Sequence, residues 1–293
     1  MQLVLQQLIN GISIGSIYAL LAVGVSLVYS ILNFSNFSHG GYISVGAYLG
    51  YFAMVSWGLP TAVALLVAVG GAGIVAILAD RGAYLPVRKR GGDPLYYTIA
   101  SLGVGIIIQN LIILIVGPNF KNYPPDLIPM RSIQVMGLYI SVFDLIAMAV
   151  AAVGLIALEF FIMKTKTGTA IRCAAFDIQT AELMGINSSV LIMTVFGIAG
   201  LLAGVGGVFL GVKYTVYPTL GTLQSKAMTG AILGGFGSVK GAIVGALLLG
   251  VLEVFVAAFV SSQMRDPIVF VILIVVLLFK PAGLMNKVVD EKV

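Results

Sequence analysis

Few residues in this chain could carry chemistry inside an apolar environment. Glu253 is the one acid well inside a long apolar run, whereas Asp144 and Glu159 stand near opposite ends of another run. Ionisable side chains are costly in a membrane, so each is a functional candidate. Glu253 could bind an ammonium group or a coupling proton on a translocation path. It could equally pair with a polar group on a neighbouring helix, which is the interpretation we favour.

A second group of polar residues surrounds the single histidine, His39. Asn33 and Asn36 precede it in the string NFSNFSHG, and Gln109 and Asn110 lie in the middle of a later apolar run. One histidine without nearby acids or thiols cannot build a metal site. The polar patch around His39 suits hydrogen bonding to backbone groups freed by a helix break. The Gln109–Asn110 pair suits interhelical bonding or a path for a neutral or zwitterionic solute. All five are therefore candidates for a translocation path.

A polar stretch interrupts the apolar runs at residues 164–187, which read KTKTGTAIRCAAFDIQTAELMGIN. Its small and apolar residues recur at spacings of one, three and four, which predicts a short helix with an apolar ridge. The ridge consists of Ala174, Ala175, Ile178 and Ala181. Such a helix could lie in a groove on a soluble partner and convert the partner's motion into a tilt of the adjoining spans. The pattern also allows a helix that lies on lipid.

The composition identifies the class of protein that must position these residues. The chain has 293 residues, of which 60% are hydrophobic and only 9% are charged, and its mean hydropathy is +1.10. Several apolar runs reach the ~20 residues that cross a bilayer as a helix. A membrane barrel would instead show short alternating segments. We therefore expect an all-α polytopic membrane protein with a single domain over residues 1–293.

Eight apolar segments and a short ninth are expected. They are Leu3–Ile31, Gly40–Trp57, Leu59–Ala79, Leu95–Val116, Leu138–Met163, Ser189–Val212, Leu223–Gly234, Gly241–Val260 and the short Pro267–Phe279. The segment at 223–234 is too short to cross alone, so it is either extended by its neighbours or re-entrant. The proline-rich loop at 117–137 is expected to form a non-helical cap or short strands.

The lysines and arginines predict the orientation. Four lie in the loop at 80–94, three in the stretch at 164–187, three in the C-terminal tail and one at Lys240, so 11 of 16 are cytoplasmic when these segments face inward. The C-terminus is then cytoplasmic and the N-terminus, which lacks Lys and Arg, lies outside. The net charge of +5 fits loops beside anionic lipid, and we expect no nucleic acid partner.

Several motifs are absent from the sequence. It holds no Walker-type phosphate loop, no HExxH and no nucleophile elbow. We therefore expect no enzymatic activity. Since only one acid lies well inside a span, the energy for transport must come from elsewhere.

Six strings spread nearly end to end carry a family resemblance. They are LINGISIGSIYALLAVGVSLVY, NFSNFSHG, DRGAYLPVR, TGTAIRCAAFDIQTAELMGIN, AMTGAILGGFGSVKGAIVGALLLG and KPAGL. In this order they resemble the branched-chain amino acid ABC transporter permease family, the LivH-type integral-membrane subunit. The resemblance implies the large, type II-like ABC importer permease fold, with short re-entrant pieces beside full spans. Cys173 and Asp80 depart from common family residues, but both are small changes.

The resemblance also implies partners and a function. A second homologous permease would pair with this chain, with a heterodimer expected and a homodimer open. Two cytoplasmic ATPases would use ATP and Mg, and an external substrate-binding protein would deliver the solute. This chain itself would hold no cofactor. The machine would import branched-chain or other neutral amino acids across the prokaryotic plasma (inner) membrane. The alternatives are import of urea or short amides, or an autonomous secondary transporter.

The stretch at 164–187 would then be the ATPase-coupling loop on the cytoplasmic side. The residues that the resemblance assigns to coupling are Gly168, Arg172, Ala174, Ala175, Asp177, Ala181, Glu182 and Gly185.

Overall fold

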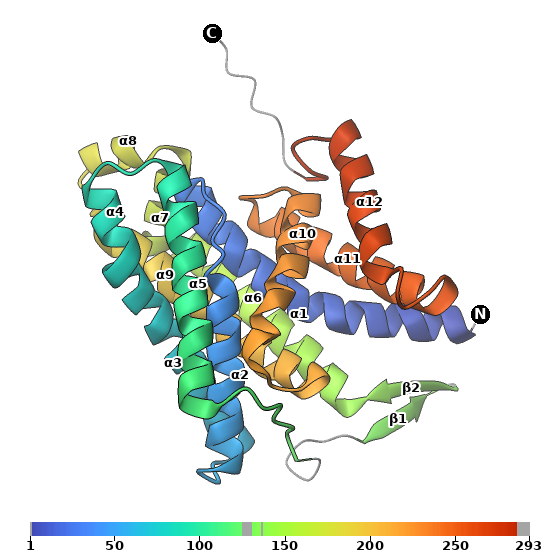
Figure 1. Ribbon diagram of the computed structural model, residues 1–293. Helices are drawn as coiled ribbons and strands as arrows, with labels where there is room; N and C mark the ends of the chain where they lie inside the picture. The colour runs from blue at the N-terminus through green and yellow to red at the C-terminus, as the bar shows by residue number, and fades with distance from the viewer. Residues whose placement is uncertain (1, 125–130, 136, 286–293) are drawn as a thin grey trace.

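The computed structural model describes residues 2–124, 131–135 and 137–285, and it is dominated by helices (Figure 1). The first half holds α1 (Gln2–Leu32), α2 (His39–Val55), α3 (Thr61–Ala79), the π-turn η1 (Asp80–Tyr84), α4 (Leu85–Lys89) and α5 (Pro94–Val116). A hairpin of β1 (Ser132–Val135) and β2 (Leu138–Ser141) follows. The second half holds α6 (Val142–Lys164), α7 (Lys166–Phe176), α8 (Ile178–Leu183), α9 (Ser188–Tyr214), the 3₁₀ turn η3 (Pro218–Leu223), α10 (Gln224–Gly234), α11 (Val239–Phe259) and α12 (Arg265–Phe279).

Six helices in the described residues are long and apolar enough to cross a membrane. They are α1, the continuous α3–η1–α4 helix, α5, α6, α9 and α11. Their length follows from unbroken apolar sequence, since a helix of ~20 residues covers the hydrocarbon core. The expectation of an all-α polytopic membrane protein is confirmed. The shorter helices α2, α10 and α12 supply the extra apolar segments of the sequence.

The short segment at 223–234 is extended by its neighbour. The 3₁₀ turn η3 leads directly into α10, so that 17 residues form one connected piece. A 3₁₀ turn rises about 2.0 Å and an α-helix about 1.5 Å per residue, which gives roughly 28 Å for the pair. The 3₁₀ turn therefore lengthens the short helix of this segment, and the pair is not among the six helices long enough to cross a membrane.

Small residues let α1 lie deep in the bundle. Every residue of α1 from Ser13 to Val28 except Ser16 is buried. Its closest neighbour is α11: a Cβ on Gly250 would lie 2.4 Å from the Cα of Gly15. In lipid, helices associate through such close backbone approach because no hydrophobic force drives them together.

Segments distant in sequence meet at two opposite ends of the molecule. Figure 1 shows α4, α7 and α8 together at one end and the β1–β2 hairpin at the other. The α10–α11 turn and the chain after α12 join the first end, since Lys240 pairs with Glu159 at 3.3 Å and the Leu284 N–H donates to the Leu233 carbonyl. The loop at 80–94, the stretch at 164–187 and Lys240, which were expected to share one side of the membrane, therefore lie at one end, whereas Lys287 and Lys292 of the tail are outside the described residues.

The predicted boundaries need two corrections. Leu138 begins a strand that pairs with β1, and the helical span starts only at Val142. The polar stretch at 164–187 holds two short helices instead of one. The loop at 117–137 includes β1, one of the two expected forms, while its residues 125–130 and 136 lie outside the described part.

Candidate functional site

Residues 164–187, here called the coupling segment, fold as a chain of short helices because capping side chains recur along it. Thr165, Asp177 and Asn187 each accept a hydrogen bond from a backbone N–H two or three residues further on, at 2.9, 2.9 and 3.1 Å. These residues stand at the N-caps of α7, α8 and α9. Each cap satisfies a free N–H and lets the chain change direction. The segment is therefore an ordered elbow between α6 and α9.

Asp177 is fully exposed and its carboxylate is held by local hydrogen bonds. The Thr180 hydroxyl and the Gln179 N–H donate to it, and both lower the pKa of Asp177 below its ordinary value. A carboxylate that accepts two hydrogen bonds is stabilised in its charged form. At neutral pH Asp177 is therefore ionised and accepts both hydrogen bonds at the N-cap of α8.

The expected apolar ridge faces this chain instead of a partner. Ala174 and Ala181 are buried and Ile178 is half-buried, whereas Ala175 is exposed. Side chains buried in their own protein cannot fill a groove on another, so the predicted direction is wrong for Ala174 and Ala181, and Ala175 is the ridge residue that stays exposed. The exposed members of the predicted coupling set are Arg172, Ala175, Asp177, Glu182 and Gly185.

Three large apolar side chains occupy the outward face of the coupling segment. Phe176, Leu183 and Met184 are 94%, 87% and 79% exposed. They sit beside the charged Asp177 and Glu182 and follow the ends of α7 and α8. We call these three residues the apolar tip. Exposed apolar groups clustered within a polar segment are typical of an interaction surface.

Two glycines fix the shape of the coupling segment. Gly168 is buried, and a Cβ there would lie 2.3 Å from the Phe161 carbonyl oxygen and 2.4 Å from that of Ile162. Only glycine lets α7 fold so closely against the end of α6. Gly185 has a φ of +85°, the left-handed conformation that ends α8.

The second element of the site is the helix break between α1 and α2, residues 33–38. Ser38 Oγ lies 2.7 Å from Asn36 Oδ1, and the backbone N–H of Ser38 donates to the same oxygen at 3.1 Å. The N–H of Phe37 donates to Ser101 Oγ on α5 at 3.0 Å. Side chains thus satisfy the backbone groups freed by the break, as the polar pattern around His39 predicts.

Gln224 joins this helix break to α10. Its Nε2 donates to the Asn36 carbonyl oxygen at 2.6 Å, and its Oε1 accepts from the N–H of Gly40. The Gln224 amide therefore binds one backbone group within the break, at Asn36, and one just after it, at Gly40. A buried side-chain amide satisfied at both ends is strongly oriented.

A cleft of about 620 Å³ lies beside Gln224, between α2, α5, η3–α10 and α12. Leu102, Ile106 and Phe270 on its rim are exposed, so the cleft is open to its surroundings. No ionisable residue of the described chain lines it. Its polar side chains carry hydroxyl and amide groups: Ser44, Gln109, Thr219, Thr222, Gln224, Ser225 and Thr229.

Glu253 belongs to a charge cluster next to the cleft. Its Oε1 lies 2.5 Å from Lys226 Nζ and 3.0 Å from Arg265 Nε, while Lys226 also pairs with Asp266 at 2.9 Å. The Glu253 side chain is 1% exposed, and its Oε2 has no hydrogen-bond partner among the described residues. Two acids and two bases thus neutralise one another between α10, α11 and α12. This arrangement agrees with the structural pairing favoured from the sequence.

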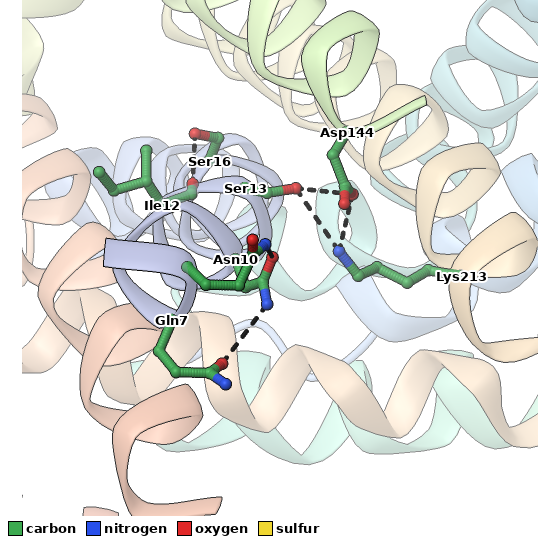
Figure 2. Close-up of polar contacts among 8 residues, drawn as sticks. Gln7, Asn10, Ile12, Ser13, Ser16, Asp144 and Lys213 are labelled. Atoms are coloured by element: carbon green, nitrogen blue, oxygen red, sulfur yellow. Dashed lines mark hydrogen bonds and ion pairs between the residues drawn. The ribbon is translucent and has the colours of Figure 1, made fainter. Parts of the chain in front are cut away.

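A similar polar contact fixes the opposite side of α1. Figure 2 shows Asp144 of α6 between Ser13 of α1 and Lys213 of α9. Asp144 Oδ1 accepts from Ser13 Oγ at 2.8 Å and from Lys213 Nζ at 2.9 Å. Asp144 is therefore paired as well as partly solvated, and the contact ties three helices together.

The structure separates the six predicted path residues. Gln109 lines the cleft, and Asn36 contacts it through Gln224. His39 is fully buried with no hydrogen-bond partner among the described residues. Asn33 is exposed with a φ of +50°, and Asn110 is exposed and donates to the Ile106 carbonyl at 2.8 Å. Glu253 lies in the charge cluster.

Sequence reasoning missed Gln224, Lys226 and the apolar tip. Gln224 and Lys226 are polar residues at the edge of a short apolar segment, a signal that could have found them.

Comparison with known proteins places the chain in a family. A family model described as the permease component of branched-chain amino acid transport systems matches residues 7–278. The high-affinity branched-chain amino acid transport system permease protein BraD of Pseudomonas aeruginosa is 37% identical, over 99% of this chain and 98% of that protein. LivH of Escherichia coli, a protein of the same description, is 35% identical over 99% and 97%. A probable LivH of Methanocaldococcus jannaschii is 28% identical over 92% and 88%. The chain therefore belongs to the branched-chain amino acid permease family of ABC transport systems, a family of multi-pass membrane subunits and not of enzymes.

Proposed function

We propose that this chain is the permease subunit of an ATP-driven importer that moves branched-chain or other neutral amino acids into the cell. The observation that carries the proposal is the cleft, whose polar lining is uncharged in the described chain. Hydroxyl and amide groups suit a neutral or zwitterionic solute. The acids in the spans are engaged in ion pairs elsewhere, so a proton- or cation-driven cycle has no free carboxylate in the cleft.

The open side of the cleft supports a second permease as partner. Leu102, Ile106 and Phe270 present apolar surface around an opening that lipid would otherwise fill. A homologous chain facing this side would complete the wall of a path between the two subunits. From the family resemblance we favour a heterodimer of two homologous permeases, with a homodimer as the alternative.

The coupling segment would face the cytoplasm and receive the ATPase subunits. The basic loops that cluster at its end of the molecule support this orientation, with the C-terminus inside and the N-terminus outside. The apolar tip would enter a groove on one ATPase subunit, and the charged Arg172, Asp177 and Glu182 around it would set the register. Residues 1–293 would act as one permease domain, with ATP and Mg held only by the partners.

Uptake by the reconstituted complex tests this function. The chain is assembled with its second permease, two ATPases and external binding protein in proteoliposomes that contain ATP. We expect labelled leucine to accumulate inside, with competition by other neutral amino acids and none by arginine or glutamate. Competition by urea or acetamide alone would indicate the amide alternative. Accumulation by this chain without any ATPase would overturn the proposal in favour of a secondary transporter.

A further inference from the structure

The helix formed by α3, η1 and α4 contains one wide turn at Asp80–Tyr84. The N–H of Leu85 donates to the carbonyl of Asp80, five residues earlier, which is the π-helical pattern. Such a turn holds one residue more than an α-helical turn, is uncommon, and often marks functional positions. In the structure the turn has this one arrangement; a shift of one residue would give it α-helical geometry.

One side of the wide turn contacts the start of α9, directly after the coupling segment. Arg81 Nη1 donates to Ser189 Oγ at 3.3 Å, and Arg81 Nη2 lies 2.9 Å from Met193 Sδ. Tyr84 stacks on Phe196, with ring centroids 4.9 Å apart. Positions 189, 193 and 196 form one stripe along the first turns of α9. A displacement of this end of α9 would therefore move the side chains that contact Arg81 and Tyr84 of the wide turn.

The other side of the wide turn contacts the helix break. The hydroxyl of Tyr84 lies 2.7 Å from Ser38 Oγ and 3.2 Å from Asn36 Oδ1, and all three residues are fully buried. The carbonyl of the same Asn36 accepts the hydrogen bond from Gln224, which lines the cleft. The buried side chain of Tyr84 thus contacts both the stripe on α9 and the residues that hold the cleft wall.

We propose that Tyr84 is a positioning residue for transport: its hydroxyl links movement of the coupling segment, through the wide turn, to the helix break and Gln224 in the cleft wall. The inference rests on the proposed function, since it assumes that ATPases act on the coupling segment. A route of packed contacts alone is not evidence of coupling, so the inference includes a second arrangement of the wide turn, shifted by one residue. The cleft wall would shift when the wide turn changes register.

Tyr42 offers a matched control. Its hydroxyl lies 2.7 Å from the same Ser38 Oγ, and its side chain is also fully buried. Tyr42, however, stands on α2 immediately after the break, and its hydroxyl contacts Ser38 and Tyr84, whereas the hydroxyl of Tyr84 also donates to Asn36 Oδ1 at 3.2 Å. Tyr84→Phe and Tyr42→Phe remove the same group from the same serine, but only the first removes the contact with Asn36, whose carbonyl holds Gln224.

The test measures amino acid taken up per ATP hydrolysed, in the complete complex reconstituted with each variant. We expect Tyr84→Phe to lower this ratio about fivefold to tenfold, the weight of one hydrogen bond in a two-state equilibrium. Tyr42→Phe should leave it unchanged. The ratio does not depend on how much complex folds, so a purely structural loss would not move it.

A second variant checks that Tyr84 acts through the break. Ser38→Ala should lower the ratio as Tyr84→Phe does, and the double variant should be no worse than either single one. Equal ratios for Tyr84→Phe, Tyr42→Phe and the unchanged complex would overturn the inference while leaving the proposed function standing. An unchanged complex that moves no amino acid would overturn both.

Discussion

Charged side chains inside this bundle are paired away from the cleft. Lys213 contacts Asp144, Arg88 contacts Asp80 at 3.3 Å, and Glu253 lies among Lys226 and Arg265. A buried charge is tolerated when a partner and hydrogen bonds replace water. At the scale of single residues, the described charges therefore fix helices, and uncharged polar groups line the cleft.

Replacing Glu253 by Gln separates the two roles that the sequence leaves open. Lys226 would keep Asp266, but Arg265 would lose its acid. We expect stability to fall by about 2 kcal/mol, less than for a fully buried pair because both bases keep partial contact with solvent. The KM for amino acid uptake should not change. Thermal unfolding in detergent and uptake kinetics in proteoliposomes measure the two effects. A raised KM with unchanged stability would assign Glu253 to the path.

Asp177 predicts a pH dependence of the coupling segment. Because its pKa is lowered in the folded protein, the cap is fully present above the ordinary carboxyl pKa and is lost as the pH falls through the lowered value. We expect hydrogen exchange at the amides of α8, corrected for the intrinsic rate, to speed up on acidification. Asp177→Asn keeps an acceptor at every pH and should show no such dependence. The same acid response in both proteins would rule out Asp177 as its source.

The elements fit together through backbone contacts as much as through side chains. Gly168→Ala should push α7 away from the end of α6, since the new Cβ would meet two carbonyl oxygens. We expect a loss of about 1–3 kcal/mol, as for overpacking in a core. Gly70→Ala is the control, because a Cβ there meets nothing within 4 Å. The melting temperature of Gly168→Ala should therefore fall below that of Gly70→Ala. A small and equal shift in both variants would mean that α7 can move away from α6 at little cost.

The apolar tip predicts how the coupling segment holds its partner. Phe176→Ser together with Leu183→Ser should reduce co-purification of the ATPases at least tenfold, because apolar anchors dominate such interfaces. The paired control, Phe176→Leu with Leu183→Met, keeps the apolar surface and should retain the partners. Both variants should fold normally, since these side chains are exposed. Undiminished co-purification with the serine variant would move the docking surface elsewhere.

Most elements could be predicted from sequence, because long apolar runs and capping residues act locally. The spans, the helix break at 33–38 and the polar coupling segment all follow from such patterns. The strand at Leu138 could not, since its apolar residues continue the pattern of the following helix. Nor could the wide turn at Asp80–Tyr84, because a one-residue excess in a helix leaves no periodic signature over so short a stretch.

At the scale of the whole molecule, Cys173 reports orientation. It is the only cysteine and it is exposed on α7. A membrane-impermeant maleimide should label it in inverted vesicles that contain the chain alone, and not in right-side-out ones. A Cys173→Ala chain with Phe120→Cys should behave in the opposite way, since Phe120 is exposed beyond the other end of α5. Labelling of Cys173 from outside would invert the proposed topology.

The candidate site depended on long-range contacts that sequence alone does not give. Gln109 was predicted from its own span, but the cleft it lines is made by helices from both halves of the chain. The ridge of Ala174 and Ala181 was recognised correctly as apolar and assigned to the wrong side, since periodicity marks a face without naming what it touches.

The packing of α1 against α11 has a consequence for the synthesis of the protein. In the turn that leads into α11, the N–H of Gly237 donates to Ser26 Oγ of α1 at 3.0 Å, across 211 positions of sequence. A ribosome adding about 5–20 residues per second needs roughly 10–40 s to cover that interval. Throughout this time α1 waits in lipid or against the insertion machinery without its principal neighbour. Its burial is thus completed long after its own synthesis.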